Sequence, residues 1–355
     1  MTETPDCLWL DIYGYRAAIR SASAGALSGI AEDFAFFRSA PHAGGIQIEL
    51  LPVEPPFGEV PSLVANVYTP RNVSYREGQR SYIDYSGRAL AIHDRASGHF
   101  RVFSRDEDLL YEAAYLFLLS QCGEALDAAH LHRVHALGVS LRGCAALVLL
   151  PIGGGKSTLG AHLLEYPDIE FLSDDSPLID ARGSVHAFPL QLGLLPGSEG
   201  TVPPDQLRRI NRMEFGPKLL VNYKYFEMRV RPEADPGLLF LGRRSLSAEC
   251  TIARASHRAA LRAMVENCVV GMGLFQGMEF VFQRGAKEIA SKAAVAWSRL
   301  RASRRLIRRS DVLHLTLGRN PAANAAAVYA ALSAAAGSSA TRDRVENRTL
   351  ARQGR

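Results

Sequence analysis

The chain has 355 residues, of which 47% are hydrophobic and 22% charged, a balance typical of a globular protein with one large or two modest domains. No apolar run approaches the ~18 residues of a membrane span, and the polar, acidic start of the chain is unlike a secretory signal. The net charge of +5 is too small to predict a nucleic-acid-binding surface over the whole chain. Five scattered cysteines favour reduced thiols and a cytoplasmic location.

Residues 1–125 carry no chemical motif and predict a small α+β domain, either for substrate recognition or purely structural. Alternating apolar residues on both sides of a Ser-Gly turn predict a hairpin over residues 81–94, and the same alternation predicts a strand over 99–103. Residues 109–121 have a helical period, and Asp106 is a suitable N-cap before them.

Residues 126–336 alternate between strand and helix patterns, which predicts an α/β domain. A hairpin is predicted over 138–150 and a short buried strand over 169–173. Residues 337–355 lack apolar periodicity and predict a disordered tail. Further strands and helices are predicted over residues 238–241, 248–252, 255–265, 288–301 and 329–335.

The most informative motif is a glycine loop that ends in Lys-Ser-Thr, between a predicted strand and a predicted helix. Its glycines let backbone N–H groups point at phosphate oxygens, and the helix N-terminus adds a positive dipole end. The lysine is suited to reach β- and γ-phosphates and the serine hydroxyl to ligate Mg²⁺. Leu150 stands where such a loop has its first glycine, and a chance glycine-rich turn is the alternative. The predicted nucleotide-binding residues are Gly153, Gly154, Gly155, Lys156, Ser157 and Thr158.

Composition also singles out Lys156. The chain has five lysines against 36 arginines. A lysine kept in this position indicates a role that arginine does not fill.

Asp174 and Asp175 follow the predicted strand 169–173. Ligands bind at the carboxyl ends of strands in open α/β sheets. Two adjacent carboxylates can divide metal binding and proton transfer between them, whereas an Asx turn or a helix cap is the alternative.

Three histidines precede the loop. His130 and His132 fit either a metal site or a strand edge, and no cysteine or carboxylate cluster completes a tetrahedral ligand set. His135 stands just before the predicted hairpin.

Weaker signals lie further along the chain. Lys218 and the pair Arg243 and Arg244 are candidate phosphate contacts, and a solvated surface is the alternative for each. The arginine-rich segment 299–309 predicts either a solvated basic face or a surface for an acidic peptide or RNA. The absence of interleaved aromatic residues disfavours RNA.

Residues 135–180 resemble the HPr kinase/phosphorylase-like serine kinases, whose core is related to phosphoenolpyruvate carboxykinase. The resemblance rests on His135, the hairpin 138–150, the loop 153–157 and the pair Asp174 and Asp175. It implies a P-loop core of mixed sheet and helices, with ATP or another nucleoside triphosphate and Mg²⁺ as cofactors. It further implies Asp174 as acid/base at the acceptor hydroxyl, Asp175 with Ser157 at the metal, and Lys156 and His135 as catalytic partners.

The chain departs from the family where residues 185–196 replace the expected Glu-x-Arg-Gly-x-Gly motif. Because of this departure, we do not expect HPr itself to be the substrate. The chain is more similar to a divergent branch that includes kinases of lasso-peptide precursors. We therefore expect a kinase acting on a Ser of a peptide or protein, without membrane or nucleic-acid partners. A small-molecule kinase, a non-catalytic nucleotide-binding protein and a homo-oligomer remain open alternatives.

Overall fold

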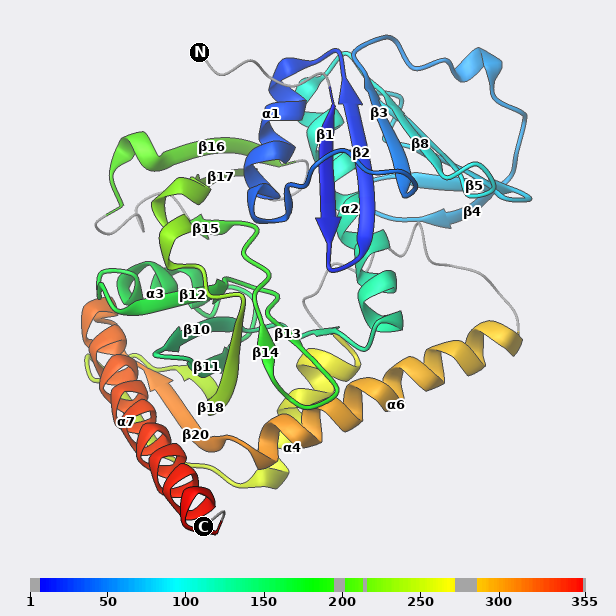
Figure 1. Ribbon diagram of the computed structural model, residues 1–355. Helices are drawn as coiled ribbons and strands as arrows, with labels where there is room; N and C mark the ends of the chain where they lie inside the picture. Colours follow the sequence, from blue (N-terminus) through cyan, green and yellow to red (C-terminus); the bar gives the residue numbers. More distant parts are fainter. Residues whose placement is uncertain (1–6, 195–201, 213–215, 272–285, 354–355) are drawn as a thin grey trace. The chain divides into compact units, whose positions relative to one another are not determined.

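The protein is described by a computed structural model that covers residues 7–194, 202–212, 216–271 and 286–353. The chain has a mixed α/β fold and divides into two compact units (Figure 1). The first unit contains the described residues up to Ala129 and the segment Arg208–Leu219, together with residues 286–288. The second unit contains the other described residues from His130 on. The sequence places a boundary at residue 125, but it does not predict that 208–219 belong with the N-terminal part.

The first unit is built on an eight-stranded sheet in the order β1-β2-β3-β8-β7-β6-β5-β4. β2, β3 and β8 run parallel, and the other neighbours pair antiparallel. The predicted hairpin over 81–94 is β6 and β7, and the predicted strand over 99–103 is β8. The strands are β1 Leu8–Ile12, β2 Tyr15–Ser21, β3 Ile46–Leu51, β4 Ala65–Tyr68, β5 Val73–Glu77, β6 Arg80–Asp84, β7 Leu90–Asp94 and β8 His99–Phe103.

Two helices pack together in this unit, α1 (Ala24–Asp33) and α2 (Glu107–Ala128). Asp106 caps α2 by accepting a hydrogen bond from the backbone N–H of Leu109, as the sequence predicts. The sequence does not predict α1 or the strands β1 to β5. Short 3₁₀ turns cover η1 Ala35–Phe37 and η2 Phe57–Glu59.

A buried ion pair holds the segment Arg208–Leu219 in the first unit. The carboxylate of Asp33, which is 3% exposed, accepts hydrogen bonds from the Tyr111 hydroxyl and from Nη2 of Arg208, the latter at 2.5 Å. The Arg208 guanidinium also lies over the Tyr111 ring, 5.4 Å from its centroid. Burial, followed by the nearby Asp33 charge, raises the pKa of Tyr111 well above its ordinary value. Arg208 belongs to β16 (Leu207–Arg212), which is followed by β17 (Gly216–Val221).

The second unit is built on a nine-stranded sheet. Its main path is β12-β10-β11-β18-β14-β13-β9, and β20 pairs with both β18 and β19. The strands are β9 His132–Arg133, β10 Leu137–Leu141, β11 Cys144–Leu149, β12 Ile169–Ser173, β13 Leu178–Ile179, β14 Val185–His186, β18 Glu233–Arg244, β19 Thr251–Arg254 and β20 Asp311–Leu317.

Strand direction determines which residues of this sheet meet. β11, β18 and β20 are parallel. β12 runs in the same direction, because β12 and β11 are both antiparallel to β10, which lies between them. The carboxyl ends of β11, β12, β18 and β20 therefore share one edge of the sheet with the amino end of β10.

Helices complete the second unit. α3 (Lys156–Leu163) packs against α7 (Pro321–Gln353), as Figure 1 shows. α4 (His257–Met264) continues directly into a π-helical turn, η6 (Val265–Val269). The remaining elements are β15 Leu192–Leu194, η3 Pro204–Gln206, η4 Tyr223–Tyr225, η5 Glu227–Arg229 and α6 Ala286–Arg308.

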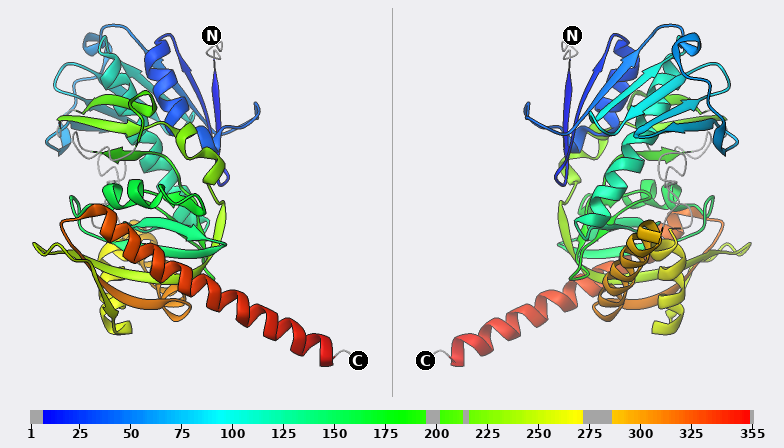
Figure 2. Two further views of the ribbon diagram at one scale, coloured as in Figure 1. Left: turned by 90° about the vertical axis from the view of Figure 1, so that its left-hand side faces the viewer. Right: turned by 90° about the vertical axis from the view of Figure 1, so that its right-hand side faces the viewer.

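α7 continues as one helix to Gln353 and so extends into the range 337–355, which the sequence predicts as a disordered tail (Figure 2). Residues 354–355 lie outside the described part of the chain. Once a helix is nucleated, each added residue gains a backbone hydrogen bond, so an extension needs no apolar face of its own. Among the described residues, no helix combines the length and the apolar character needed to cross a membrane.

Candidate active site

The glycine loop lies between the end of β11 and the start of α3, at the shared edge of the sheet in the second unit. Gly153 and Gly155 have positive φ angles of +72° and +98°, and Gly155 is the N-cap of α3. A Cβ added at Gly154 would lie 2.8 Å from the carbonyl oxygen of Pro151. The loop therefore requires glycine at each of these three positions: at Gly153 and Gly155 because of the positive φ, and at Gly154 because of the close backbone contact.

Leu150 does not prevent the loop from closing. Its side chain is 2% exposed and packs against Gly242 of β18, where an added Cβ would lie 2.6 Å from Leu150 Cδ2. Behind it the loop is closed by a hydrogen bond of 2.9 Å from the N–H of Gly154 to the carbonyl of Pro151. Space for a leucine at the strand end thus comes from a glycine on the neighbouring strand.

Lys156 is buried at the start of α3, with 7% of its surface exposed. Its Nζ lies 2.8 Å from Nε2 of His135, donates to the carbonyl of Leu150 at 2.9 Å and lies 3.6 Å from Oδ1 of Asp175. Burial lowers the pKa of the Lys156 ammonium, and the charges of Asp175 and Asp174 oppose that shift. The buried amine is thus held by partners on three different segments.

The two carboxylates of the predicted pair have different surroundings. Asp174 is 5% exposed, and its Oδ2 accepts hydrogen bonds from Ser157 Oγ at 2.7 Å and from the N–H of Gly193 at 3.2 Å. A hydroxyl and a carboxylate that lie side by side are oxygen ligands of the kind that Mg²⁺ prefers. Residues present here therefore fit a divalent cation, although the partner of Ser157 is Asp174 and not Asp175.

Asp175 is more open. Its side chain is 52% exposed, and Oδ1 lies 3.1 Å from Nε2 of His135. Ser173 fixes the turn that carries the two carboxylates. Its Oγ donates to the carbonyl of Phe188 at 2.8 Å and accepts from the N–H of Ser176 at 3.1 Å. An exposed carboxylate beside an imidazole is suited to proton transfer from an incoming group.

His135 reaches the site from the amino end of β10. It is 3% exposed, and its backbone N–H donates to the carbonyl of Asn267 at 2.9 Å. His130 and His132 do not join it. Nδ1 of His130 and Nε2 of His132 lie 3.0 and 2.9 Å from Oγ of Ser298 on α6, so the three histidines do not converge on one site.

Arg243 and Arg244 end β18 at the same edge. Nη1 of Arg244 lies 3.9 Å from the position of a Cβ at Gly155, so this guanidinium approaches the loop. Nε of Arg243 instead donates to Thr316 Oγ1 at 3.0 Å. Lys218 lies on β17, in the part assigned to the first unit, whereas the other candidate site residues belong to the second unit.

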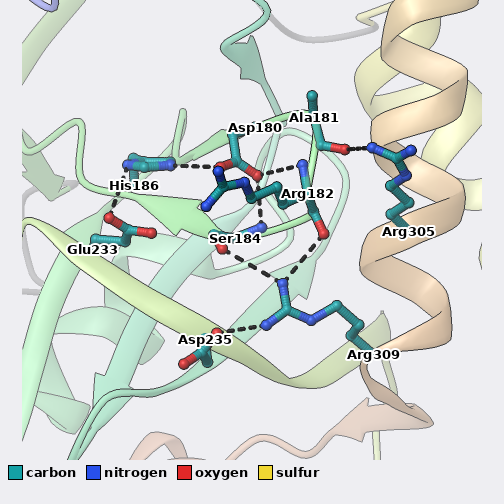
Figure 3. Close-up of polar contacts among 9 residues, drawn as sticks. All are labelled: Asp180, Ala181, Arg182, Ser184, His186, Glu233, Asp235, Arg305 and Arg309. Atoms are coloured by element: carbon teal, nitrogen blue, oxygen red, sulfur yellow. Dashed lines mark hydrogen bonds and ion pairs between the residues drawn. The ribbon is translucent and has the colours of Figure 1, made fainter.

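A separate polar cluster surrounds the turn between β13 and β14 (Figure 3). Among the described residues, Asp180, His186 and Glu233 are the one group of three with close metal-type ligand atoms. Asp180 Oδ2 faces Nε2 of His186 at 3.4 Å, whereas Glu233 Oε2 faces Nδ1 at 4.0 Å. The two carboxylates thus approach different nitrogens of the His186 ring. One ligand atom from each of the three residues nevertheless lies within 4.8 Å of the other two, so the cluster has the spacing of a cation site as well as that of a hydrogen-bonded network.

The arginine-rich segment 299–309 contributes to the same network. Arg305 donates to the carbonyl of Ala181, and Nη1 of Arg309 donates to that of Arg182 at 3.2 Å (Figure 3). Nη2 of Arg309 also pairs with Asp235 at 2.5 Å. These arginines fasten the β13–β14 turn to α6, which is a structural use that the sequence analysis did not predict.

Several site residues carry no sequence signal. The backbone N–H of Gly193, the carbonyl of Asn267 and the space provided by Gly242 come from segments far apart in the chain. Comparison with known proteins adds no assignment, because no protein-family model matches the chain and no curated protein matches it significantly.

Proposed function

We propose that this protein is a kinase that transfers the γ-phosphoryl group of ATP, or of another nucleoside triphosphate, to a hydroxyl group. The observation that supports this most is the convergence of Lys156, the Ser157–Asp174 pair and the His135–Asp175 pair at one sheet edge. These are the parts that phosphoryl transfer requires: a phosphate cradle, oxygen ligands for a metal and a proton acceptor.

The surroundings of the carboxylates favour a division of roles that is the reverse of the one implied by the family resemblance. Asp174 and Ser157 would hold Mg²⁺, which supplies charge neutralisation for the phosphates when bound. Asp175, which is half-exposed and 3.1 Å from His135, takes the acid/base role. Its exposure leaves room for a large acceptor, which supports a Ser of a peptide or protein over an enclosed small molecule.

The reaction then proceeds by positioning and proton transfer. The acceptor oxygen forms a bond to the γ-phosphorus while the bond from that phosphorus to the β–γ bridging oxygen breaks. Asp175 accepts the hydroxyl proton, and ADP and a phosphate ester are the products. Lys156 and Arg244 stabilise the charge on the oxygens of the transferred group.

The test compares Asp174→Asn with Asp175→Asn. Calorimetric titration measures ATP binding with and without Mg²⁺, and release of radiolabelled phosphate from Mg·ATP measures turnover with water as acceptor. We expect Asp174→Asn to lose the Mg²⁺-dependent part of binding. We expect Asp175→Asn to keep it and to lose turnover by roughly 10²- to 10⁴-fold. The reverse pattern would restore the family's assignment of roles, and absence of ATP binding by the unmodified protein would refute the proposed function.

A further inference from the structure

The backbone at His135 and at the residue before it is hydrogen-bonded to two other segments of the second unit. The N–H of Val134 donates to the carbonyl of Pro177, just after the carboxylate turn, at 2.9 Å. The N–H of His135 donates to the carbonyl of Asn267, in the π-helical turn η6, also at 2.9 Å. The imidazole position relative to Lys156 and Asp175 therefore depends on where η6 lies.

The π-helical turn is in turn held by α6. Nη1 of Arg299, a residue that is 9% exposed, donates to the carbonyls of Cys268 at 3.2 Å and Val269 at 3.1 Å. A π-helical turn in an α-helix is uncommon and often occurs near functional sites. A buried guanidinium with two carbonyl acceptors fixes the end of this turn by charge-assisted hydrogen bonds.

Ser298, the residue before Arg299, contacts the segment that precedes His135. Oγ of Ser298 lies 2.9 Å from Nε2 of His132, which is fully buried three residues before His135. Two neighbouring residues of α6 thus bind the chain that leads into His135 and the turn that accepts its N–H. These contacts of Ser298 and Arg299 lie on the segments that flank His135, so their effect is directed at the imidazole.

We infer that Arg299 is a positioning residue for His135, acting through η6, with Ser298 as its partner on the other flank. This inference rests on the proposed function for its catalytic consequence, but its structural content does not. Arg299 donates to backbone carbonyls of η6, so its loss is expected to disturb the imidazole while leaving the phosphate loop and the metal ligands in place.

The first measurement is independent of activity. In protein labelled with ¹⁵N-histidine, the His135 imidazole signals are identified by their loss in His135→Gln. Arg299→Met is expected to shift these signals, and Arg299→Lys to shift them less. Arg301→Met is the matched control, because Arg301 is an exposed arginine on the same helix. Unchanged His135 signals in a folded Arg299→Met protein would overturn the inference, whether or not the protein is a kinase.

The second measurement is a double-mutant cycle on Mg·ATP turnover with water as acceptor. Arg299→Met is expected to lower kcat roughly 10- to 100-fold and to leave KM for Mg·ATP within about twofold, because the phosphate loop is untouched. In a His135→Ala background the same change is expected to have less than about a twofold effect. An equal loss in both backgrounds would show that Arg299 does not act through His135.

A folding control keeps the test decisive. Circular dichroism and the Tm establish whether Arg299→Met is folded. If it is not, Ser298→Ala replaces it in both measurements, since that change removes only the hydroxyl near His132. Absence of any effect of Ser298→Ala on the His135 signals would then count against the inference. Absence of ATP binding by the unmodified protein would count against the proposed function alone.

Discussion

The side-chain amine of Lys156 is buried, and its close partners leave space only for a compact group such as an ammonium. Replacing it by alanine should abolish ATP-dependent turnover and preserve the fold. Arginine should fail as well, because a planar guanidinium does not fit where Nζ lies 2.8 Å from His135 Nε2 and 2.9 Å from the Leu150 carbonyl. Turnover and calorimetric ATP titration check both variants, with the Tm as the control for folding. Near-normal turnover in either variant would remove the loop from the mechanism.

The sequence was sufficient to predict that Lys156, Ser157 and the carboxylate pair lie together, because the loop and the pair each follow a strand and the carboxyl ends of parallel strands meet at one sheet edge. It could not assign the two carboxylates. Adjacent residues at a strand end differ only in the direction of their side chains, and that direction depends on distant partners. The N–H of Gly193 and the imidazole of His135 decide which carboxylate is buried.

His93 gives a pH dependence at the same scale. Its ring is packed edge-on against Phe117, and Nδ1 is buried without a hydrogen-bond partner among the described residues. Burial, with a smaller contribution from Arg95, lowers the pKa of His93 from 6.5 to about 4. The unfolded chain therefore binds more protons than the folded one between these values, so stability falls as the pH falls from about 6.5 towards 4.

The expected loss is at most about 3 kcal/mol over that interval. It is measured as the difference in unfolding free energy between the unmodified protein and His93→Leu at several pH values, because other groups also titrate. His99→Leu, which changes an exposed histidine on β8, is the matched control. If His93→Leu has the same pH profile as the unmodified protein, burial does not lower the pKa of His93 in the folded state.

At the scale of elements, the turn between β13 and β14 is fixed to α6 at very short range. Gly183 has φ +85°, and a Cβ there would lie 2.7 Å from the backbone nitrogen of Leu306. Gly183→Ala should combine left-handed strain with a backbone clash and cost about 2–4 kcal/mol.

Gly87→Ala is the control for strain alone, because Gly87 has φ +75° and nothing lies within 4 Å of its Cβ position. It should cost about 1–2 kcal/mol. Urea unfolding measures both variants. Equal costs would indicate that the turn moves away from α6 without penalty.

Elements with local signals were predicted well. A capping aspartate, a Ser-Gly turn and alternating residues are sufficient for α2, β6, β7 and β8. The sequence analysis missed β20, although it pairs with β18 at the centre of the second sheet. It also underestimated β18, which begins at Glu233 and passes through Pro236 and Gly237. These residues disfavour a strand locally. Pro236 nevertheless pairs with Ala145 of β11, and Gly237 lies at the register shift between β11 and β18, where such residues are tolerated.

At the scale of the whole molecule, the chain returns from the second unit to complete the first. Arg208 supplies the cation for Asp33, which is 3% exposed, so Arg208→Ala should leave a buried carboxylate unpaired and cost about 3–5 kcal/mol. Asp33→Ala with Arg208→Ala should cost less than the sum of the single changes.

Arg209→Ala is the control for this pair, because Arg209 is the exposed neighbour on β16. Urea unfolding followed by circular dichroism measures all four variants. Additive costs would mean that the ion pair makes no joint contribution. A fragment ending at Ala129 lacks Arg208, and we expect it to be less stable than the first unit is in the full chain. No local pattern predicts this division, because it depends on one long-range ion pair.

The packing of Leu150 against Gly242 has a consequence for how relatives of this chain are found. Search patterns that demand glycine at the start of a phosphate loop reject any protein that has exchanged it for a bulky residue. The geometry predicts covariation: a large aliphatic residue at the position of Leu150 should occur with glycine at that of Gly242, and glycine at the first with a larger residue at the second. A search pattern that scores the two positions jointly would retain divergent loops that single-position patterns discard. Its criterion would be the combined side-chain volume at the two positions, which neighbouring strands must accommodate.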